Sequence, residues 1–353
     1  MMVFGIDPHK QTHTAAAADA VGRKKAEKTV KARPAGYREL IAWARDLEPG
    51  ERTWAVEDVR HVASGLVREL LAAGEEVRFI PTRLMAGTRR GGRERGKSDP
   101  IDALANARAC LREDAFLPAA RLNGRVLEVR RLADHRDDLV AARTRVTNRL
   151  RWLVHDLDPG LAPAPRALAG AKGRRLLDQG LRALPACAGR DIAVSQLAAI
   201  TRLTEQIRGI EKALEALLHD LCPRLLQVCG IGIVSAARIL GETGDIRRFR
   251  SPGAYARHNG TAPIPVSSGT GPGGPQRLNR GGNRQLNAAV HRTALTQARC
   301  HDGARALLER RAGEVRETRK AALRVLKRHL SDVIYRALNA DAWRLDEPSQ
   351  HAA

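Results

Sequence analysis

The first third of the chain alternates short apolar stretches with amphipathic ones, and this alternation constrains the fold more than any other feature. The spacing predicts strands over 3–7, 13–19, 25–30, 53–57 and 77–80. It predicts helices over 37–44, 62–73 and 98–113. The order β-β-β-α-β-α-β-α indicates an α/β layer, with helices packed on a mixed sheet.

The remainder of the chain has helical periodicity. Apolar residues recur at helical spacing over 122–157 and again over 192–221, and a stretch rich in Pro and Gly, 159–173, separates the two. Two such helices can pack as an antiparallel hairpin, which favours a long helical arm of coiled-coil type. An ordinary helical subdomain is the equally weighted alternative. The predicted fold class is therefore α/β plus all-α.

A glycine turn follows the second long helix. Gly230 and Gly232 enclose one apolar residue between two predicted helices within 223–240. Such a hairpin presents backbone N–H groups at a helix start and resembles the helix-hairpin-helix DNA module. A simple turn between packed helices is the alternative.

The charge of the chain indicates its partner. Lys and Arg number 61 against 39 Asp and Glu, a formal net charge of +22, so the field attracts polyanions. Aromatic residues make up only 3%, so we expect contact mainly with phosphate rather than stacked bases. The candidate contacts lie in the basic loop 83–97 and within or just after the Gly-, Pro- and Ser-rich stretch 263–282: Arg89, Arg90, Arg93, Arg95, Lys97, Arg277, Arg280 and Arg284.

Cysteine usage and hydropathy indicate the compartment. The five cysteines are an odd number without Cys-x-x-Cys spacing, which argues against a disulfide framework and against a zinc ribbon. No run reaches the roughly 18 apolar residues of a membrane span. We therefore expect a cytoplasmic protein that has no membrane partner.

Four carboxylates are the candidate metal ligands. Asp7 and Glu57 each end a predicted strand, and Asp99 and Asp102 lie three residues apart at a helix start. If the two strands are neighbours, as in folds of the ribonuclease H type, all four converge at one sheet end. Oxygen ligands suit Mg²⁺, and two ions about 4 Å apart would assist phosphoryl transfer, with Mn²⁺ able to substitute.

Each acid taken alone has a simpler explanation. Asp99 followed by Pro100 and Asp102 is an ordinary helix start with a capping residue and a favourable dipole charge. Asp7 alone is a strand-end acid, and Glu57 alone a surface group. Only their order along the chain makes the set specific.

The sequence also contains a candidate nucleophile. Ser267 and Ser268 precede Gly269, and a serine there could attack a phosphodiester to form a covalent phosphoserine. Serine pairs beside glycine are commonly turns, which is the alternative. His9 and His13 lie near Asp7 in the sequence, and we interpret both as solvated loop residues.

Two distant motifs resemble one family, the DEDD transposases of bacterial insertion sequences of the IS110 type. Residues 5–10, Gly-Ile-Asp-Pro-His-Lys, look like its first RuvC-like strand, and Lys-Ser-Asp-Pro-Ile-Asp-Ala at 97–103 is similar to its acidic signature. Residues 260–269 and 277–286 resemble its C-terminal transposase motif. The resemblance covers nearly the whole chain.

The resemblance implies roles for these residues. It implies Asp7, Glu57, Asp99 and Asp102 as metal ligands and Ser268 as nucleophile, with Ser267 as the neighbouring candidate. It also implies a guide (bridge) RNA, and a composite site that subunits of a dimer or tetramer share across the arm. The domains expected are a RuvC-like domain at 1–117, the arm at 118–221, the transposase domain at 222–345 and a tail at 346–353.

Two other functions fit the same residues. In a RuvC-like Holliday-junction resolvase the acids would activate water, and the serine loop would only bind phosphate. In a non-catalytic nucleic-acid-binding protein the acids would be helix caps and strand-end groups. Strand transfer by a recombinase is the preferred prediction.

Overall fold

The structure is a computed structural model that describes residues 1–57, 62–81, 84, 98–113, 117–121, 123–265, 276–277, 279, 281–313 and 318–346. It divides into two compact units. The first comprises 1–123 with 244–339, and the second comprises 124–243 with 340–353. The segment 223–243 thus belongs to the unit that contains the arm, whereas the domain boundaries expected from the sequence remain a prediction.

A five-stranded mixed sheet forms the N-terminal part of the first unit. Its strand order is β3-β2-β1-β4-β5; β1 pairs with β2 and β2 with β3 antiparallel, whereas β1 pairs with β4 and β4 with β5 in parallel. The strands are β1 Met2–Pro8, β2 Thr12–Ala18, β3 Lys24–Lys31, β4 Arg52–Glu57 and β5 Glu76–Ile80. The predicted mixed sheet of the ribonuclease H and RuvC type is confirmed.

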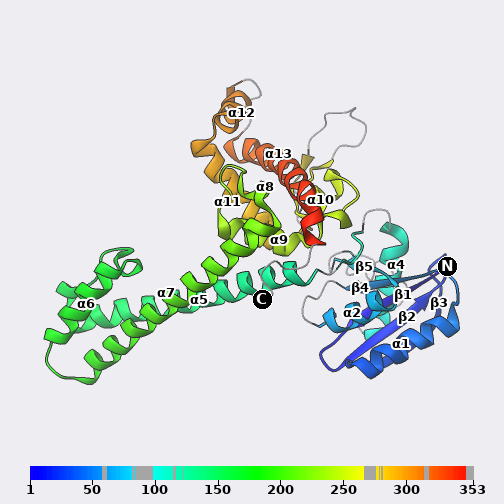
Figure 1. Ribbon diagram of the computed structural model, residues 1–353, viewed down its shortest axis with the longest axis horizontal. Helices are drawn as coiled ribbons and strands as arrows, with labels where there is room; N and C mark the ends of the chain where they lie inside the picture. Colours follow the sequence, from blue (N-terminus) through cyan, green and yellow to red (C-terminus); the bar gives the residue numbers. More distant parts are fainter. Residues whose placement is uncertain are drawn as a thin grey trace. The chain divides into compact units, whose positions relative to one another are not determined.

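Helices cover both faces of this sheet (Figure 1). One face packs on α1 (Pro34–Leu47) and α2 (Ser64–Ala72), and a buried cluster around Phe4 and Trp54 fills the space between them. The other face packs on α4 (Asp99–Glu113). Because neighbouring strand residues point to opposite faces, Phe4 and Ile6 lie under α1 and α2, whereas Val3 and Gly5 face α4.

The C-terminal part of the first unit is helical. Its elements are η4 Ile246–Arg248, α10 Pro252–His258, β6 Ile264–Pro265, β7 Gln276–Arg277, α11 Arg284–Cys300, α12 Asp302–Gly313 and α13 Arg319–Ala340. The short strands β6 and β7 pair antiparallel on either side of 266–275. Tyr335 on α13 donates its hydroxyl to the carbonyl of Phe249, at 3.1 Å.

Two long helices make up most of the second unit, and Figure 1 shows them side by side. These are α5 (Gly124–Leu157) and α7 (Ala188–Leu221), which confirms both predicted helices. Their contacts run in opposite directions along the chain, because Arg125 pairs with Asp220 and Arg136 with Glu211. The arm is therefore an antiparallel hairpin.

The connection between the two long helices differs from the prediction. It holds the short turns η2 (Pro159–Leu161) and η3 (Ala167–Ala169) and a further helix, α6 (Ala171–Ala183). Leu177 and Leu181 of α6 are buried against both long helices. The Pro- and Gly-rich composition marked the start of the break correctly but not the helix that follows it.

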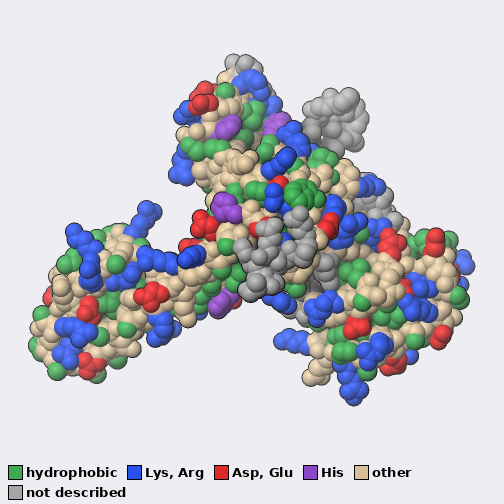
Figure 2. Space-filling view, viewed as in Figure 1, with side chains coloured by type: hydrophobic (Ala, Val, Ile, Leu, Met, Phe, Trp, Pro, Cys, Tyr) green, Lys and Arg blue, Asp and Glu red, His purple; other side chains and the backbone are tan. Residues whose placement is uncertain are grey.

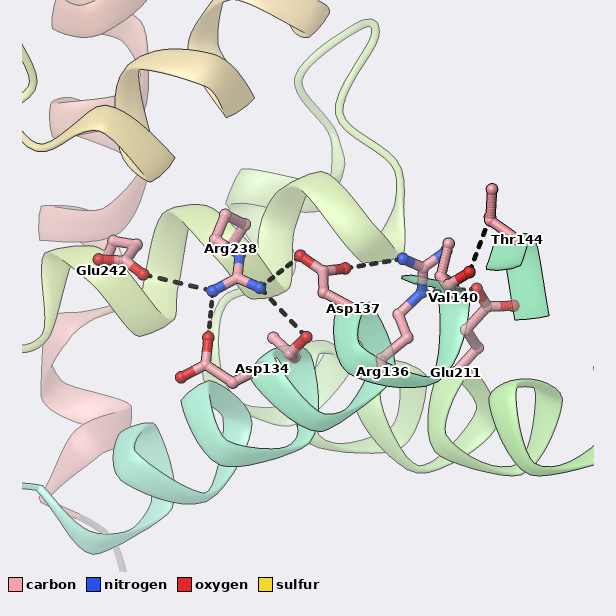
Figure 3. A network of polar contacts seen from close by, with 9 residues as sticks. Asp134, Arg136, Asp137, Val140, Thr144, Glu211, Arg238 and Glu242 are labelled. Atoms are coloured by element: carbon pink, nitrogen blue, oxygen red, sulfur yellow. Dashed lines mark hydrogen bonds and ion pairs between the residues drawn. The ribbon is translucent and has the colours of Figure 1, made fainter. Parts of the chain in front are cut away.

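A buried arginine fastens α9 (Ile233–Thr243) to α5, as Figure 3 shows. Arg238 is 4% exposed and donates to Asp134, to Asp137 at 2.7 Å, to Glu242 at 3.3 Å and to the carbonyl of Ala133 at 3.1 Å. The guanidinium fork therefore has a partner for each terminal nitrogen. This set of partners makes α9 part of the arm unit.

The ion pairs continue from α5 to α7. Arg136 donates to Asp137 at 3.0 Å and to Glu211 on α7 at 2.8 Å (Figure 3).

The remaining elements of this unit are the single helical turn α8, Pro223–Leu226, and η5, Ala342–Leu345. Among the described residues, no helix is long and apolar enough to cross a membrane.

Candidate active site

Two of the predicted acids lie at neighbouring strand ends. Asp7 is near the end of β1 and Glu57 ends β4, and both are buried, with 6% and 7% of their surface exposed. The parallel register pairs Ile6 with Val56, so the next residue on each strand lies beside the other and on the same face. The expected pairing of these two strands is confirmed.

The helix that carries the other two acids lies on that same face. Asn106 of α4 is fully buried and donates its amide to the carbonyl of Ile6, at 2.8 Å. Gly5 permits the close approach, because a Cβ at this position would overlap the carbonyl oxygen of Ala103. The helix axis thus passes directly over β1, immediately beside Asp7.

The start of α4 completes the cluster. Asp102 is 5% exposed, and its amide donates to the carbonyl of Ser98 at 3.0 Å, whereas the side chain of Asp99 is half exposed. The ligand atoms of Asp7, His9 and Asp99 all lie within 4.8 Å of one another. The structure therefore brings Asp7, Asp99 and Asp102 close together at the end of the central strand β1, and Glu57 ends the neighbouring strand β4.

Sequence reasoning missed one residue of this cluster. His9, interpreted as a solvated loop residue, places Nε2 3.2 Å from Asp7 Oδ2 and 3.3 Å from Asp99 Oδ1. Its ring is half exposed and bridges the two carboxylates. The available signal was its position two residues after a strand-end acid.

Charge repulsion within the cluster affects Asp7. Burial raises the pKa of its carboxyl above the ordinary value, nearby His9 opposes that rise, and Asp102 and Asp99 add to it. Buried carboxylates that repel one another are stabilised by a divalent cation, and carboxylate oxygens with an imidazole nitrogen suit such an ion. The residues present therefore fit a metal centre.

His13 does not belong to the cluster, and its interpretation as a solvated loop residue was wrong. It lies within β2, is fully buried and stacks on Tyr37 with ring centroids 5.4 Å apart. Burial lowers the pKa of its imidazole. Because Thr14 is the β2 residue paired with Asp7, His13 points to the opposite face of the sheet.

Much of the predicted nucleic-acid surface lies outside the described residues. This applies to both serines, Ser267 and Ser268, and to Arg89, Arg90, Arg93, Arg95, Lys97 and Arg280. Arg277 on β7 and Arg284 at the start of α11 are described, and both are exposed. Lys and Arg side chains are spread over the visible face of both units (Figure 2).

The glycine turn is only partly as predicted. Gly230 has φ +82°, a conformation that favours glycine, and Gly232 directly precedes α9. The helix before the turn is a single turn of four residues, α8, so the motif has only one full helix. The predicted hairpin of two helices is therefore incomplete.

An open cavity adjoins this turn. Its volume is about 450 Å³, and it lies between α7 and the start of α9. Four charged side chains of α7 and four residues of the α9 end line it: Arg208, Glu211, Lys212, Glu215, Gly232, Ile233, Val234 and Ser235. Two cations and two carboxylates of α7 therefore line this cavity together with the first residues of α9, and the sequence analysis did not identify it.

The five-stranded mixed sheet, with buried acids at the ends of β1 and β4, defines a ribonuclease H and RuvC-like domain, which a helical arm follows in the chain. A family model described as "Transposase", for DEDD transposases of the IS110 type, matches residues 4–159. A second, "Transposase IS116/IS110/IS902 family", matches residues 222–309. The two matches contain all four acids and the serine pair.

Curated relatives agree with the family models. The chain is 30% identical to the "Insertion element IS116 uncharacterized 44.8 kDa protein" of Streptomyces clavuligerus, over 78% of this chain and 80% of the relative. It is 28% identical to the "Insertion element IS900 uncharacterized 42 kDa protein" of Mycobacterium paratuberculosis, over 93% of each. It is also 28% identical to a "Probable family 20 transposase" of Pseudomonas aeruginosa, over 66% of this chain and 68% of the relative.

The chain belongs to the IS116/IS110/IS902 transposase family and is a DNA transposase of an insertion sequence. Membership implies that it binds DNA and uses a divalent metal ion. It does not favour either alternative, the junction resolvase or the non-catalytic binding protein.

Proposed function

We propose that this transposase cleaves and rejoins DNA under the guidance of an RNA, through a covalent phosphoserine intermediate. The observation that carries the proposal is the meeting of two strand ends and the start of α4 on one face of the sheet, with Asp7 at the centre. The guide RNA rests on the family resemblance and on the net charge of +22, which suits two nucleic acids at once.

Asp7, Glu57, Asp99 and Asp102 would hold the metal, which we take to be two Mg²⁺ ions. Bound Mg²⁺ would stabilise the charge that develops on phosphate oxygens. The protein's own contribution is to bury Asp7, Glu57 and Asp102, to fix α4 through Asn106, and to place His9 within hydrogen-bond distance of the Asp7 carboxyl. The fixed carboxylates bind without reorganising during the reaction.

Ser268 is the proposed nucleophile, with Ser267 as the neighbouring candidate. Its Oγ attacks phosphorus, so an Oγ–P bond forms and one P–O bond of the DNA backbone breaks. The serine proton is lost to solvent, and the leaving oxygen takes up a proton to become a hydroxyl. Attack by a hydroxyl of the second DNA end then reverses the chemistry and frees the serine. The transfer conserves the energy of the phosphodiester, which favours strand transfer over hydrolysis.

The test uses the protein purified with its bound RNA, incubated with Mg²⁺ and labelled DNA that carries the element ends. We expect a covalent protein–DNA adduct that Ser268→Ala abolishes, whereas Ser267→Ala, the matched control, retains it. If cleavage persists without an adduct in both serine variants, the junction resolvase is the better description. If Asp102→Ala leaves all processing unchanged, the acids have no catalytic role.

The arm is the proposed contact between subunits of a dimer or tetramer, in which the metal centre and the serine come from different copies. This arrangement predicts complementation. A mixture of Asp102→Ala and Ser268→Ala proteins should regain activity, because mixed assemblies contain one intact composite site.

We place the reaction in the cytoplasm, where the DNA of a bacterial cell lies.

A further inference from the structure

The two chain segments on either side of 266–275 are fastened to each other at their bases. The amide of Asn283 donates to the carbonyl of His258 at 2.7 Å, and β6 pairs with β7. Gly260 adopts φ +74°, and a Cβ on Gly282 would overlap the backbone of Gly260. The two flanking segments therefore pack closely where Gly260 meets Gly282, and this contact leaves no space for a side chain on Gly282.

A fully buried asparagine organises this point. Asn259 Oδ1 accepts from the Thr261 hydroxyl at 2.7 Å and from its amide at 3.0 Å, and Asn259 Nδ2 donates to Ser331 Oγ of α13 at 2.8 Å. The carbonyl of Asn259 accepts from Asn287 Nδ2 of α11 at 2.7 Å. The turn at 259–261 is thereby fixed to two helices by side-chain hydrogen bonds.

The last member of this network is a lysine. Lys327 lies on α13, is 8% exposed, and donates Nζ to Asn287 Oδ1 at 2.8 Å. Within the described part of the chain, no carboxylate lies within ion-pair distance of this ammonium. Burial lowers the pKa of Lys327, and nearby Arg324 lowers it further.

A buried ammonium without a counter-charge is a costly way to support a fold. An apolar side chain of similar length would fill the same space without that penalty. The cost is understandable if the ammonium fixes the orientation of the Asn287 amide: with Oδ1 held by Lys327, Nδ2 is directed at the carbonyl of Asn259. The ammonium of Lys327 can only donate, so it determines which end of the Asn287 amide faces the turn.

We propose that Lys327 is a positioning residue for the strand-transfer reaction: through Asn287 it fixes the turn at Asn259, from which the chain leads to Ser267 and Ser268. This inference rests on the proposed serine chemistry. Lys327 acts through the side chain of Asn287 and the backbone carbonyl of Asn259, and it has no role in bond making. The expected effect of losing it is therefore a slower attack with unchanged binding of DNA.

The test compares Lys327→Met with Lys320→Met, an exposed lysine of the same helix that serves as the matched control. We measure the single-turnover rate of serine–DNA adduct formation at saturating DNA, together with the DNA concentration that gives half the maximal rate. For Lys327→Met we expect the maximal rate to fall roughly tenfold to a hundredfold, as for a small misplacement of a reacting group, with half-saturation unchanged. Lys320→Met should match the unmodified protein in both quantities.

A second variant separates positioning from folding. Asn287→Asp gives the ammonium a carboxylate partner but removes the Nδ2 donor to Asn259. We expect its melting temperature to equal or exceed that of the unmodified protein, with the adduct rate reduced as in Lys327→Met. An unmodified protein that forms no adduct would refute the serine chemistry and this inference with it. An adduct that forms at the normal rate in Lys327→Met, or in a folded Asn287→Asp protein, would overturn the positioning role alone.

Discussion

Asp7 and Glu75 are two buried acids whose surroundings shift their pKa values in opposite directions. Each is 6% exposed, yet the pKa of Asp7 is raised and that of Glu75 is lowered. Burial raises both, but Glu75 accepts hydrogen bonds from Arg52, Trp54 and Arg45 that outweigh it. Asp7 instead faces two other acids. The first arrangement stabilises the fold, and the second is typical of a functional site.

Glu75 should make the sheet domain sensitive to acid. Its pKa is lower in the folded protein than in the unfolded chain, so its contribution is complete above the unfolded pKa of about 4.3 and is lost as the pH falls through the folded pKa. Glu75→Gln should lower the free energy of unfolding at pH 7 by about 1–3 kcal/mol and have a smaller effect in acid. Denaturant unfolding at pH 7 and pH 3 measures this.

The control for that measurement is Glu51→Gln, at an exposed position just before β4. It should leave the free energy of unfolding unchanged at both pH values. An equal loss for Glu75→Gln at pH 7 and in acid would mean that the ionised form of Glu75 has no special stabilisation.

At the scale of elements, the approach of α4 to β1 decides whether the acids meet. Gly5→Ala would push the helix away, because the added Cβ overlaps the Ala103 carbonyl and lies 2.5 Å from the amide nitrogen of Ala107. We expect a loss of stability of about 1–3 kcal/mol and a large loss of metal-dependent DNA cleavage, although every acid remains. Calorimetric titration with Mn²⁺ and a cleavage assay measure the two effects.

Gly124→Ala is the matched control for this substitution. Gly124 begins α5, and a Cβ there meets nothing within 4 Å. It should bind metal and cleave DNA normally. Normal metal binding by a folded Gly5→Ala protein would show that the arrangement of the metal ligands does not depend on the close packing of α4 against β1.

At the scale of the whole molecule, the excess of 22 positive charges should make nucleic-acid binding strongly dependent on salt. If the protein neutralises six to ten phosphates, affinity should fall roughly 10³- to 10⁵-fold between about 50 and 200 mM salt, because binding releases counterions. Titrations of labelled DNA at several salt concentrations measure the slope. Removing one exposed cation, as in Arg284→Ala, should reduce the slope by about one if that side chain meets a phosphate. An affinity that is indifferent to salt would contradict a phosphate-based interface.

Local patterns were sufficient for most elements and failed where neighbours decided the outcome. The continuous apolar run of β1 and the helical period in α5 and α7 reflect which residues are buried, so they are visible in the sequence. The helix before Gly230 was overestimated, because apolar residues at 223–229 continue past the single turn that forms. His13 looked like a polar loop residue, and only its place in β2 shows that it is buried.

By itself, the sequence determined the order of strands and helices in the first third of the chain, the two long helices, the positions of four acids and the excess of positive charge, since each depends on residue type and spacing alone. The tertiary structure decided the rest: that β1 and β4 are parallel neighbours, that α4 lies on the face to which Asp7 points, and that His9 joins it. It also decided that Lys327 reaches Asn287 across 40 positions of sequence. Such contacts depend on which faces meet when the elements pack, and no local pattern records that choice.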